Sequence, residues 1–128
     1  MSALSDYAEN KLLDHLLGTT TYTAPTTVYI GLATASFTDA NSSVELTGNN
    51  YARKSIAFED AASGATDNTS AVEFNAATGS WGNVSHFGLF DQSTGGNLLV
   101  HGAFTTPKTI ASGDVLKIDA GDLDITAD

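Results

Sequence analysis

The sequence contains no cysteine, and its 128 residues include only two prolines, one methionine and one tryptophan. Without cysteine there are no disulfide bonds and no thiolate metal sites, so packing or oligomerisation must stabilise the fold. Basic residues are also few, since five lysines and arginines stand against fifteen acidic residues and give a formal net charge of −10. Nucleic-acid binding depends on cations that neutralise phosphates, so this balance argues against a nucleic-acid partner.

Long apolar runs are missing as well. No run approaches the ~20 residues of a membrane-spanning helix. The N-terminal residues do not combine a basic segment, an apolar segment and a small-residue cleavage site, so we expect neither a membrane partner nor a secretory signal. The length suits one compact domain, residues 1–128.

Two apolar runs predict a β-hairpin in the second half of the chain. They are Val84–Phe90 and Asn97–Phe104, and the segment DQSTGG between them is dense in turn-forming residues. Pro107 lacks a backbone N–H, so we expect it to break the second run. Ser112–Asp114 is then a turn that leads into a further strand.

Further short strands are predicted at intervals marked by turn residues: Thr27–Thr34, Tyr51–Phe58, Ser70–Phe74, Val115–Ile118 and Leu123–Ile125. We expect the last two to form a closing hairpin. Two polar segments, 36–50 and 59–69, read as loops that carry function or simply lie on the surface. Because no βαβ alternation is present, the fold class is mainly β: an antiparallel β-sandwich or jelly-roll-like domain with strands over 27–126.

An amphipathic helix is predicted over Ser5–Leu17, within residues 4–18. Ser5 is a suitable N-cap and Gly18 a suitable left-handed stop. Four leucines, with Ala8, form its apolar stripe: Leu12, Leu13, Leu16 and Leu17. A helix this short is marginal alone in water, so the stripe must pack on the sheet of its own chain, on the same helix of another copy, or on another protein.

Catalytic and metal-binding patterns are not recognisable. His86 and His101 could approach each other across the hairpin, but zinc needs three or four ligands and no further set is visible. Ser85–His86 lacks the context of a nucleophile elbow. The C-terminal acids do not have the spacing of a calcium loop; they are Asp114, Asp119, Asp122, Asp124 and Asp128. We therefore predict no enzyme activity, no metal and no cofactor.

The aromatic residues allow two interpretations. Trp81 precedes Gly82 at the start of a predicted strand, where it would be an anchor in the core or at a subunit interface. Alternatively, the aromatic rings could stack on sugars in a lectin-like site; these are Trp81, Tyr7, Tyr22, Tyr29 and Tyr51.

Four segments that span nearly the whole chain carry a family resemblance: LSDYAENKLLDHLLGTT (4–20), PTTVYIGLAT (25–34), YARKSI (51–56) and WGNVSHFGLFDQSTGGNLLVHGAFTTPKTIASGD (81–114). The helix followed by HFGLFD and GGNLLVHG in this order is the most specific part. The combination resembles a family of small bacteriophage virion proteins commonly labelled tail fibre proteins. The resemblance implies a structural role in the virion.

Within that class, a compact β domain with one apolar helix is similar to capsid decoration (cement) proteins, which are often trimers. We expect a homo-oligomer, specifically a trimer, that bridges major capsid subunits or contacts other virion proteins, because linked weak contacts add up. The leucines at 12, 13, 16 and 17 with Trp81, or residues 1–4, would make these contacts. The alternative is a tail fibre, tail knob or head-fibre adhesin that binds host-surface glycans.

Overall fold

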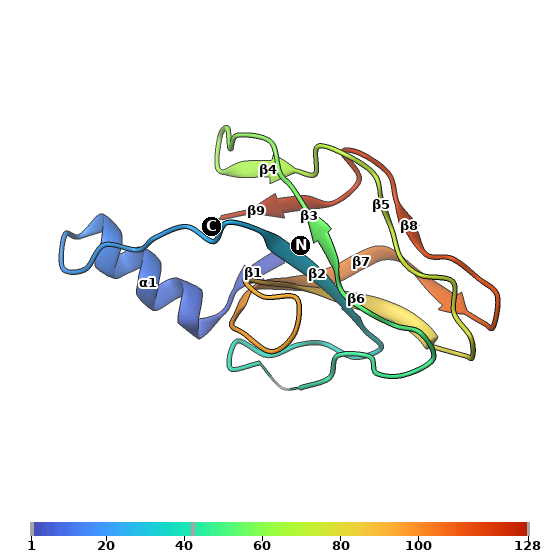
Figure 1. Ribbon diagram of the computed structural model, residues 1–128. Coiled ribbons are helices and arrows are strands. Elements are labelled where there is room, and N and C mark those ends of the chain that lie inside the picture. Colours follow the sequence, from blue (N-terminus) through green and yellow to red (C-terminus); the bar gives the residue numbers. More distant parts are fainter. Residues whose placement is uncertain (1, 42, 128) are drawn as a thin grey trace.

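The computed structural model describes residues 2–41 and 43–127. Its elements are β1 (Ser2–Leu4), α1 (Asp6–Leu16), β2 (Val28–Ala33), β3 (Lys54–Ile56), β4 (Ala65–Asp67), β5 (Val72–Glu73), β6 (Gly82–Phe90), β7 (Leu98–Ile110), β8 (Lys117–Ile118) and β9 (Asp124–Thr126) (Figure 1). The mainly β class is confirmed. No helix in the described ranges has the length and apolarity needed to span a membrane.

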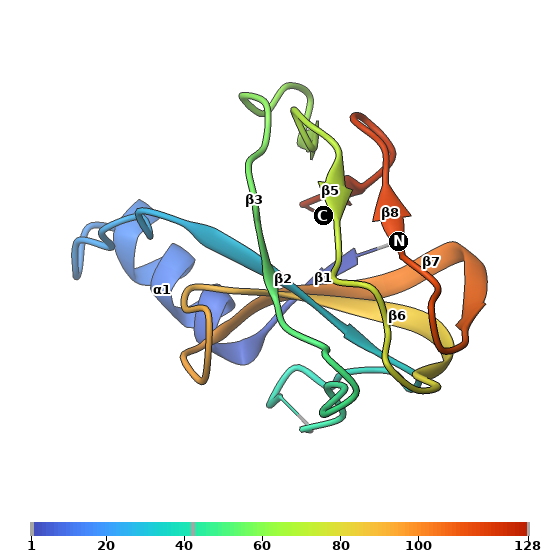
Figure 2. The same cartoon turned by 45° about the vertical axis from the view of Figure 1, so that its right-hand side comes forward.

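The strands form one antiparallel five-stranded sheet, in the order β1-β7-β6-β2-β3, and two antiparallel two-stranded ladders, β4-β9 and β5-β8. The ladders lie over one face of the sheet (Figures 1 and 2). Among the described residues, this covering layer is two separate ladders and not one continuous sheet, so the sandwich or jelly-roll form of the prediction is not confirmed.

The main core lies between the sheet and the ladders. β2 and β6 alternate their side chains, which places Ile30, Leu32, Phe87 and Leu89 on this face. They pack with apolar residues of the covering layer: Val72, Phe74, Leu116, Ile118 and Leu123. All of these side chains are buried, so burial of this apolar surface is the main stabilising term.

The opposite face of the sheet has a smaller core of its own. Phe90 and Leu98 pack there with Phe37, which is only 2% exposed, and Val44 packs against this cluster. Phe37 and Val44 come from the polar segment 36–50. This segment is therefore anchored to the sheet through its apolar residues.

The predicted hairpin is confirmed, but the predicted break at Pro107 is wrong. β7 continues through Pro107 to Ile110. The pairing passes from Val84↔Lys108 to His86↔Ala103, so residues 104–107 of β7 lie opposite Ser85 alone. Pro107 is within this bulge, where a ladder N–H is not required.

The predicted C-terminal hairpin is also wrong. β8 pairs with β5, and β9 pairs with β4. Buried Asn68 directs this arrangement: its side-chain amide donates to the carbonyl of Asp119 (3.0 Å), and its side-chain oxygen accepts from the N–H of Leu123 (2.9 Å). The turn between the two strands is thereby fixed to a distant loop.

Two further elements differ from the sequence-based expectation. Residues 2–4 form the edge strand β1, paired with β7, and do not form a free arm; Met1 lies outside the described residues. The segment 59–69 contains β4, which pairs with β9. Both strands are three residues long, too short for an alternating pattern to reveal them.

Candidate interaction surfaces

The exposed apolar surface of the molecule is concentrated on α1. The helix begins and ends within one residue of the predicted bounds, but it does not bury its stripe on the sheet of its own chain. The leucines of the stripe are exposed by 42% (Leu12), 55% (Leu13), 67% (Leu16) and 75% (Leu17). We call these four residues the leucine face.

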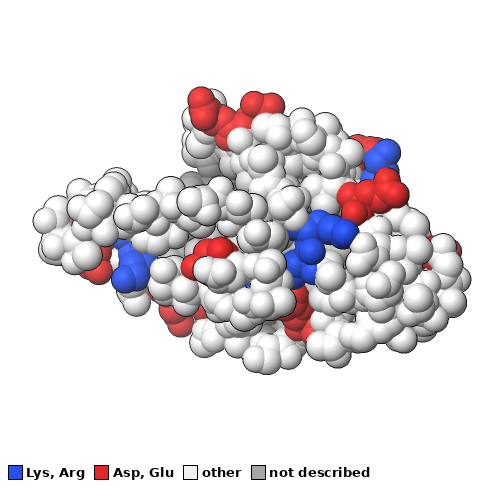
Figure 3. Space-filling view, in the orientation of Figure 1, with Lys and Arg blue, Asp and Glu red and all other residues white. Residues whose placement is uncertain are grey.

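The leucine face is carried on a projection of the molecule. α1 and the segment that returns from it to β2 extend together from the body (Figures 1 and 2), and we call residues 6–27 the helical arm. Figure 3 shows that the tip of the arm is uncharged on this side, with charged atoms along its lower edge, and that acidic atoms lie over β4 at the top of the body. A projection that exposes four leucines is suited to contact with another protein surface.

The base of the arm is firmly fixed. Ser5 is 1% exposed, and its hydroxyl donates to the carbonyl of Leu98 and accepts from the N–H of Ala8 (3.1 Å). The N–H of Asp6 donates to the carbonyl of Asp39 (2.9 Å). Gly18 has φ +80°, the left-handed conformation expected of a helix stop. The sequence-based assignment of both caps is confirmed.

Trp81, the other predicted interaction residue, lies in the core. It is 5% exposed, its indole N–H donates to the carbonyl of Asn49 (3.0 Å), and its ring packs edge-on against Tyr51 at 5.6 Å. The structure therefore gives Trp81 the core position, the first of its two expected roles. Tyr51 packs beside it, so neither ring is presented for stacking on a ligand.

Each of the three histidines has a hydrogen-bond partner. The N–H of Tyr22 donates to Nδ1 of His15 (3.1 Å), and the hydroxyl of Ser85 lies 2.7 Å from Nδ1 of His86. His101 lies 2.7 Å from Asp39 through Nε2. The contact of His86 lies within β6, whereas those of His15 and His101 connect α1 to the segment after it and β7 to the 36–50 segment.

The structure contains a polar network centred on Arg53 that was not predicted from the sequence. The guanidinium makes two hydrogen bonds to Glu45 (2.8 and 2.7 Å), two to the carbonyls of Gln92 and Gly95 (2.8 Å each), and lies 3.6 Å from the ring centroid of Phe90. It links the 36–50 segment to the β6–β7 turn. Gln92 and Gly95 are 39 and 42 residues from Arg53 in the sequence, and no motif connects the members of the network.

Tyr51 extends this network into the sheet. Its hydroxyl donates to Glu45 (2.6 Å) and accepts from the backbone N–H of Leu32 (2.9 Å). Burial and the hydrogen bond to Glu45 raise the pKa of Tyr51 well above its ordinary value. Gly31 lies directly beneath, where an added Cβ would come within 2.6 Å of a Glu45 oxygen.

An acidic cluster lies at the base of the arm. Carboxylate oxygens of Asp6, Glu9 and Asp39 are within 4.8 Å of one another, and all three residues are exposed. This is a different set from the C-terminal acids considered above, of which Asp128 lies outside the described residues. Exposed acids gather in this way without a metal, so we assign none here.

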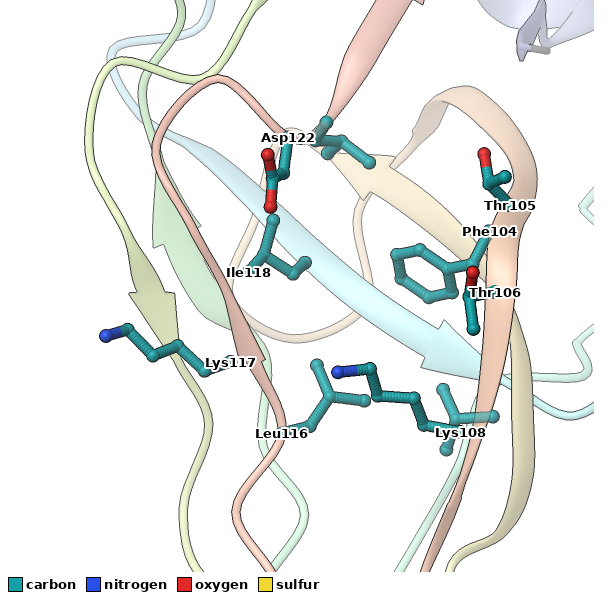
Figure 4. Close-up of a pocket in the computed structure, with 10 residues that line it drawn as sticks. Phe104, Thr105, Thr106, Lys108, Leu116, Lys117, Ile118 and Asp122 are labelled. Atoms are coloured by element: carbon teal, nitrogen blue, oxygen red, sulfur yellow. The ribbon is translucent and has the colours of Figure 1, made fainter.

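A cavity of about 290 Å³ lies between β7 and residues 116–123. Phe104 and Lys108 extend from β7 toward Leu116 and Ile118, and Asp122 approaches from the other end (Figure 4). Lys117 also lines the cavity, but its side chain points away from Lys108. The cavity therefore combines an apolar floor with a polar rim.

Comparison with protein families places the chain among phage proteins. The family described as podophage GP4 fiber I protein gp80 matches residues 3–126, and no curated protein matches. The chain belongs to this phage fibre protein family, which confirms the resemblance seen in the sequence. Its role is structural, as a component of the virion.

Proposed function

We propose that this protein is a non-enzymatic component of a phage fibre that assembles as a homo-oligomer through the leucine face of α1. The exposure of these four leucines carries the proposal. Membership of a fibre protein family supports the fibre assignment over the broader virion role.

A second copy of the chain is the partner that these features favour. An 11-residue helix gains little stability by itself, and α1 has no buried residue within its own chain. Packing leucine faces together would both stabilise the helix and remove its apolar surface from water. A fibre repeats one subunit about an axis, so the same face would recur at every copy.

The energetics favour more than two copies. The leucine face leaves more than two leucine equivalents exposed per chain, worth on the order of 5 kcal/mol when buried. Association costs an estimated ~4–15 kcal/mol. For a pair of helices, the free energy gained by burying the leucines is therefore close to the cost of association. Three helices around an axis would cover each leucine face from two sides. We therefore propose a trimer.

The leucine face would also suit a capsid decoration protein, our second candidate. The helix that carries it, α1, lies at one end of the molecule (Figure 1), so the leucine face could attach to a capsid shell as well as to another copy. The two candidates differ in the location and number of copies on the particle.

The oligomer is tested by measuring the mass of the protein in solution before and after substitution of Leu13 and Leu16 by glutamine. We expect a trimer for the unchanged chain and a monomer for the double variant, with the β-sheet circular dichroism retained. Val115→Gln is the matched control, because Val115 is 44% exposed but lies away from the arm. A monomeric unchanged chain, or a variant that remains oligomeric, would contradict the proposal.

The location is tested by immunogold labelling of intact virions together with a count of copies per particle. A small number of copies confined to fibres would support the fibre assignment. Hundreds of copies spread over the head would replace it with capsid decoration.

A further inference from the structure

The cavity between β7 and residues 116–123 has the size and chemistry of a small-ligand site, and we propose that it binds one uronic-acid unit of a polysaccharide. Its volume of about 290 Å³ is just below the roughly 300–1,000 Å³ typical of ligand pockets. One sugar ring is the scale of ligand that such a space holds.

The cavity owes its wall to the bulge in β7. Residues 104–107 lie opposite Ser85 alone, so this part of the strand leaves the regular ladder. Phe104, Thr105 and Thr106 belong to the bulge and line the cavity. Bulges commonly redirect side chains beside functional sites, and this one places an aromatic ring and two hydroxyls on the same wall.

The apolar part of the cavity provides a platform for a sugar ring. The ring of Phe104 is held against Phe87 at a centroid distance of 5.4 Å, and it extends toward Ile118 (Figure 4). Leu116 and Ile118 close the floor and are 4% and 8% exposed. The C–H face of a hexose is apolar and packs on such a surface.

The polar groups on the rim match the substituents of the ring. Thr105 and Thr106 offer hydroxyls that both donate and accept, and the Asp122 carboxylate accepts from sugar hydroxyls. Lys108 lies at the end of the cavity away from Asp122 (Figure 4), so a carboxylate on the ligand is placed next to Lys108 and away from Asp122.

Lys108 is the reason for specifying an acidic sugar. The chain has five cations. Arg53, Lys54 and Lys117 each have a polar side-chain partner, and Lys11 lies over the Tyr7 ring. Within residues 2–41 and 43–127, no hydrogen bond, ion pair or ring contact engages the ammonium of Lys108. Its charge is available to a ligand.

The experiment is an NMR titration of the ¹⁵N-labelled chain with methyl glucuronide and, separately, methyl glucoside. We expect amide shifts confined to residues 104–108 and 116–123, with dissociation constants on the order of millimolar. The glucuronide should bind about three-fold more tightly than the glucoside, because a single exposed ion pair contributes modestly.

Two variants separate the contributions. Lys108→Met should make the two sugars bind equally, whereas Phe104→Leu should weaken both. Lys11→Met is the matched control for loss of one positive charge, and it should leave both affinities unchanged.

Three results would overturn the inference. These are no shifts at ligand concentrations on the order of 100 mM, acetate binding as tightly as the glucuronide, or a change of oligomer mass in Lys108→Met that marks the cavity as a contact between copies. The titration is repeated on the Leu13/Leu16 double variant. Because this variant is expected to be monomeric, the repeat shows whether sugar binding depends on assembly, and the two proposals are tested separately.

Discussion

The helical arm and the body of the molecule distribute their side chains in opposite ways. In the body, a charged guanidinium is nearly enclosed: the side chain of Arg53 is 8% exposed and that of Glu45 is 20% exposed. On the arm, Leu16 and Leu17 are mostly in water. Buried charge and exposed leucine are both the reverse of the usual distribution.

The difference is between polar groups that find partners within the chain and apolar side chains that remain in water. The hydrogen bonds of Arg53 all go to groups of its own chain, and each buried polar side-chain atom in the described residues has a partner. The side chains of the leucine face, in contrast, are not covered by the rest of the chain. The polar groups buried in the body are therefore paired, whereas the leucines of the arm stay in water, which is why we propose a partner for the arm.

The largest expected effect comes from breaking the Arg53 network. Arg53→Met would leave Glu45 and the carbonyls of Gln92 and Gly95 without their donor, so we expect the free energy of unfolding to fall by about 3 kcal/mol. Urea denaturation measures this change. Lys117→Met is the control, because its pair with Asp119 is exposed and spans 3.6 Å, and its loss should cost less than about 1 kcal/mol. Equal costs for the two variants would contradict the role given to the network.

A smaller effect is expected at Tyr51, with a distinct dependence on pH. Tyr51→Phe removes the acceptor of the Leu32 N–H and should cost about 1–3 kcal/mol near neutral pH. Because the pKa of Tyr51 is raised by folding, the folded chain keeps this proton after the unfolded chain begins to lose it, near pH ~10.

The stability that comes from protonated Tyr51 is therefore fully present below pH ~10 and is lost as the pH rises further. The unchanged protein should lose up to about 1.4 kcal/mol more per pH unit than Tyr51→Phe in this range. Denaturation curves recorded on both sides of pH ~10 measure the difference. Parallel pH profiles of the two proteins would show that Tyr51 is not the group concerned.

The smallest effect should come from the base of the arm. Ser5→Ala removes the N-cap of α1 and the hydroxyl that donates to Leu98, at a cost of about 1 kcal/mol. Hydrogen exchange should accelerate in α1 more than in β6. Thr19→Val is the control, since the hydroxyl of Thr19 bonds to Asp14 at the exposed end of the arm. Equal acceleration in α1 and β6 would mean that the arm and body unfold as one unit.

Local features were predictable where their signals lie close together in the sequence. Ser5 and Gly18 mark the ends of α1, and both caps form as expected. The β6–β7 hairpin also follows from two apolar runs separated by turn residues, with Leu89 opposite Val100. Pro107 was misjudged because a bulge, which depends on the partner strand, removes the need for its N–H.

The candidate sites also differ in whether they could be predicted from the sequence. The leucine face could be identified from helical spacing, but not whether the sheet would cover it. The cavity beside Phe104 and Lys108 could not be identified, because its two walls come from segments that pair with different partners. Asn68, which holds the turn before Leu123, has no recognisable signal in the sequence.

Caps, turns and alternation act between near neighbours, so the β class, the capped helix and the central hairpin could be predicted from the sequence alone. The phage family could be recognised there too, from the motifs HFGLFD and GGNLLVHG. The pairing of strands far apart in the chain, the contact of Arg53 with the β6–β7 turn and the exposure of the leucine face became evident only in the folded molecule. Long-range pairing and packing depend on how surfaces from different segments fit together. The residue pattern of a single segment does not contain this information.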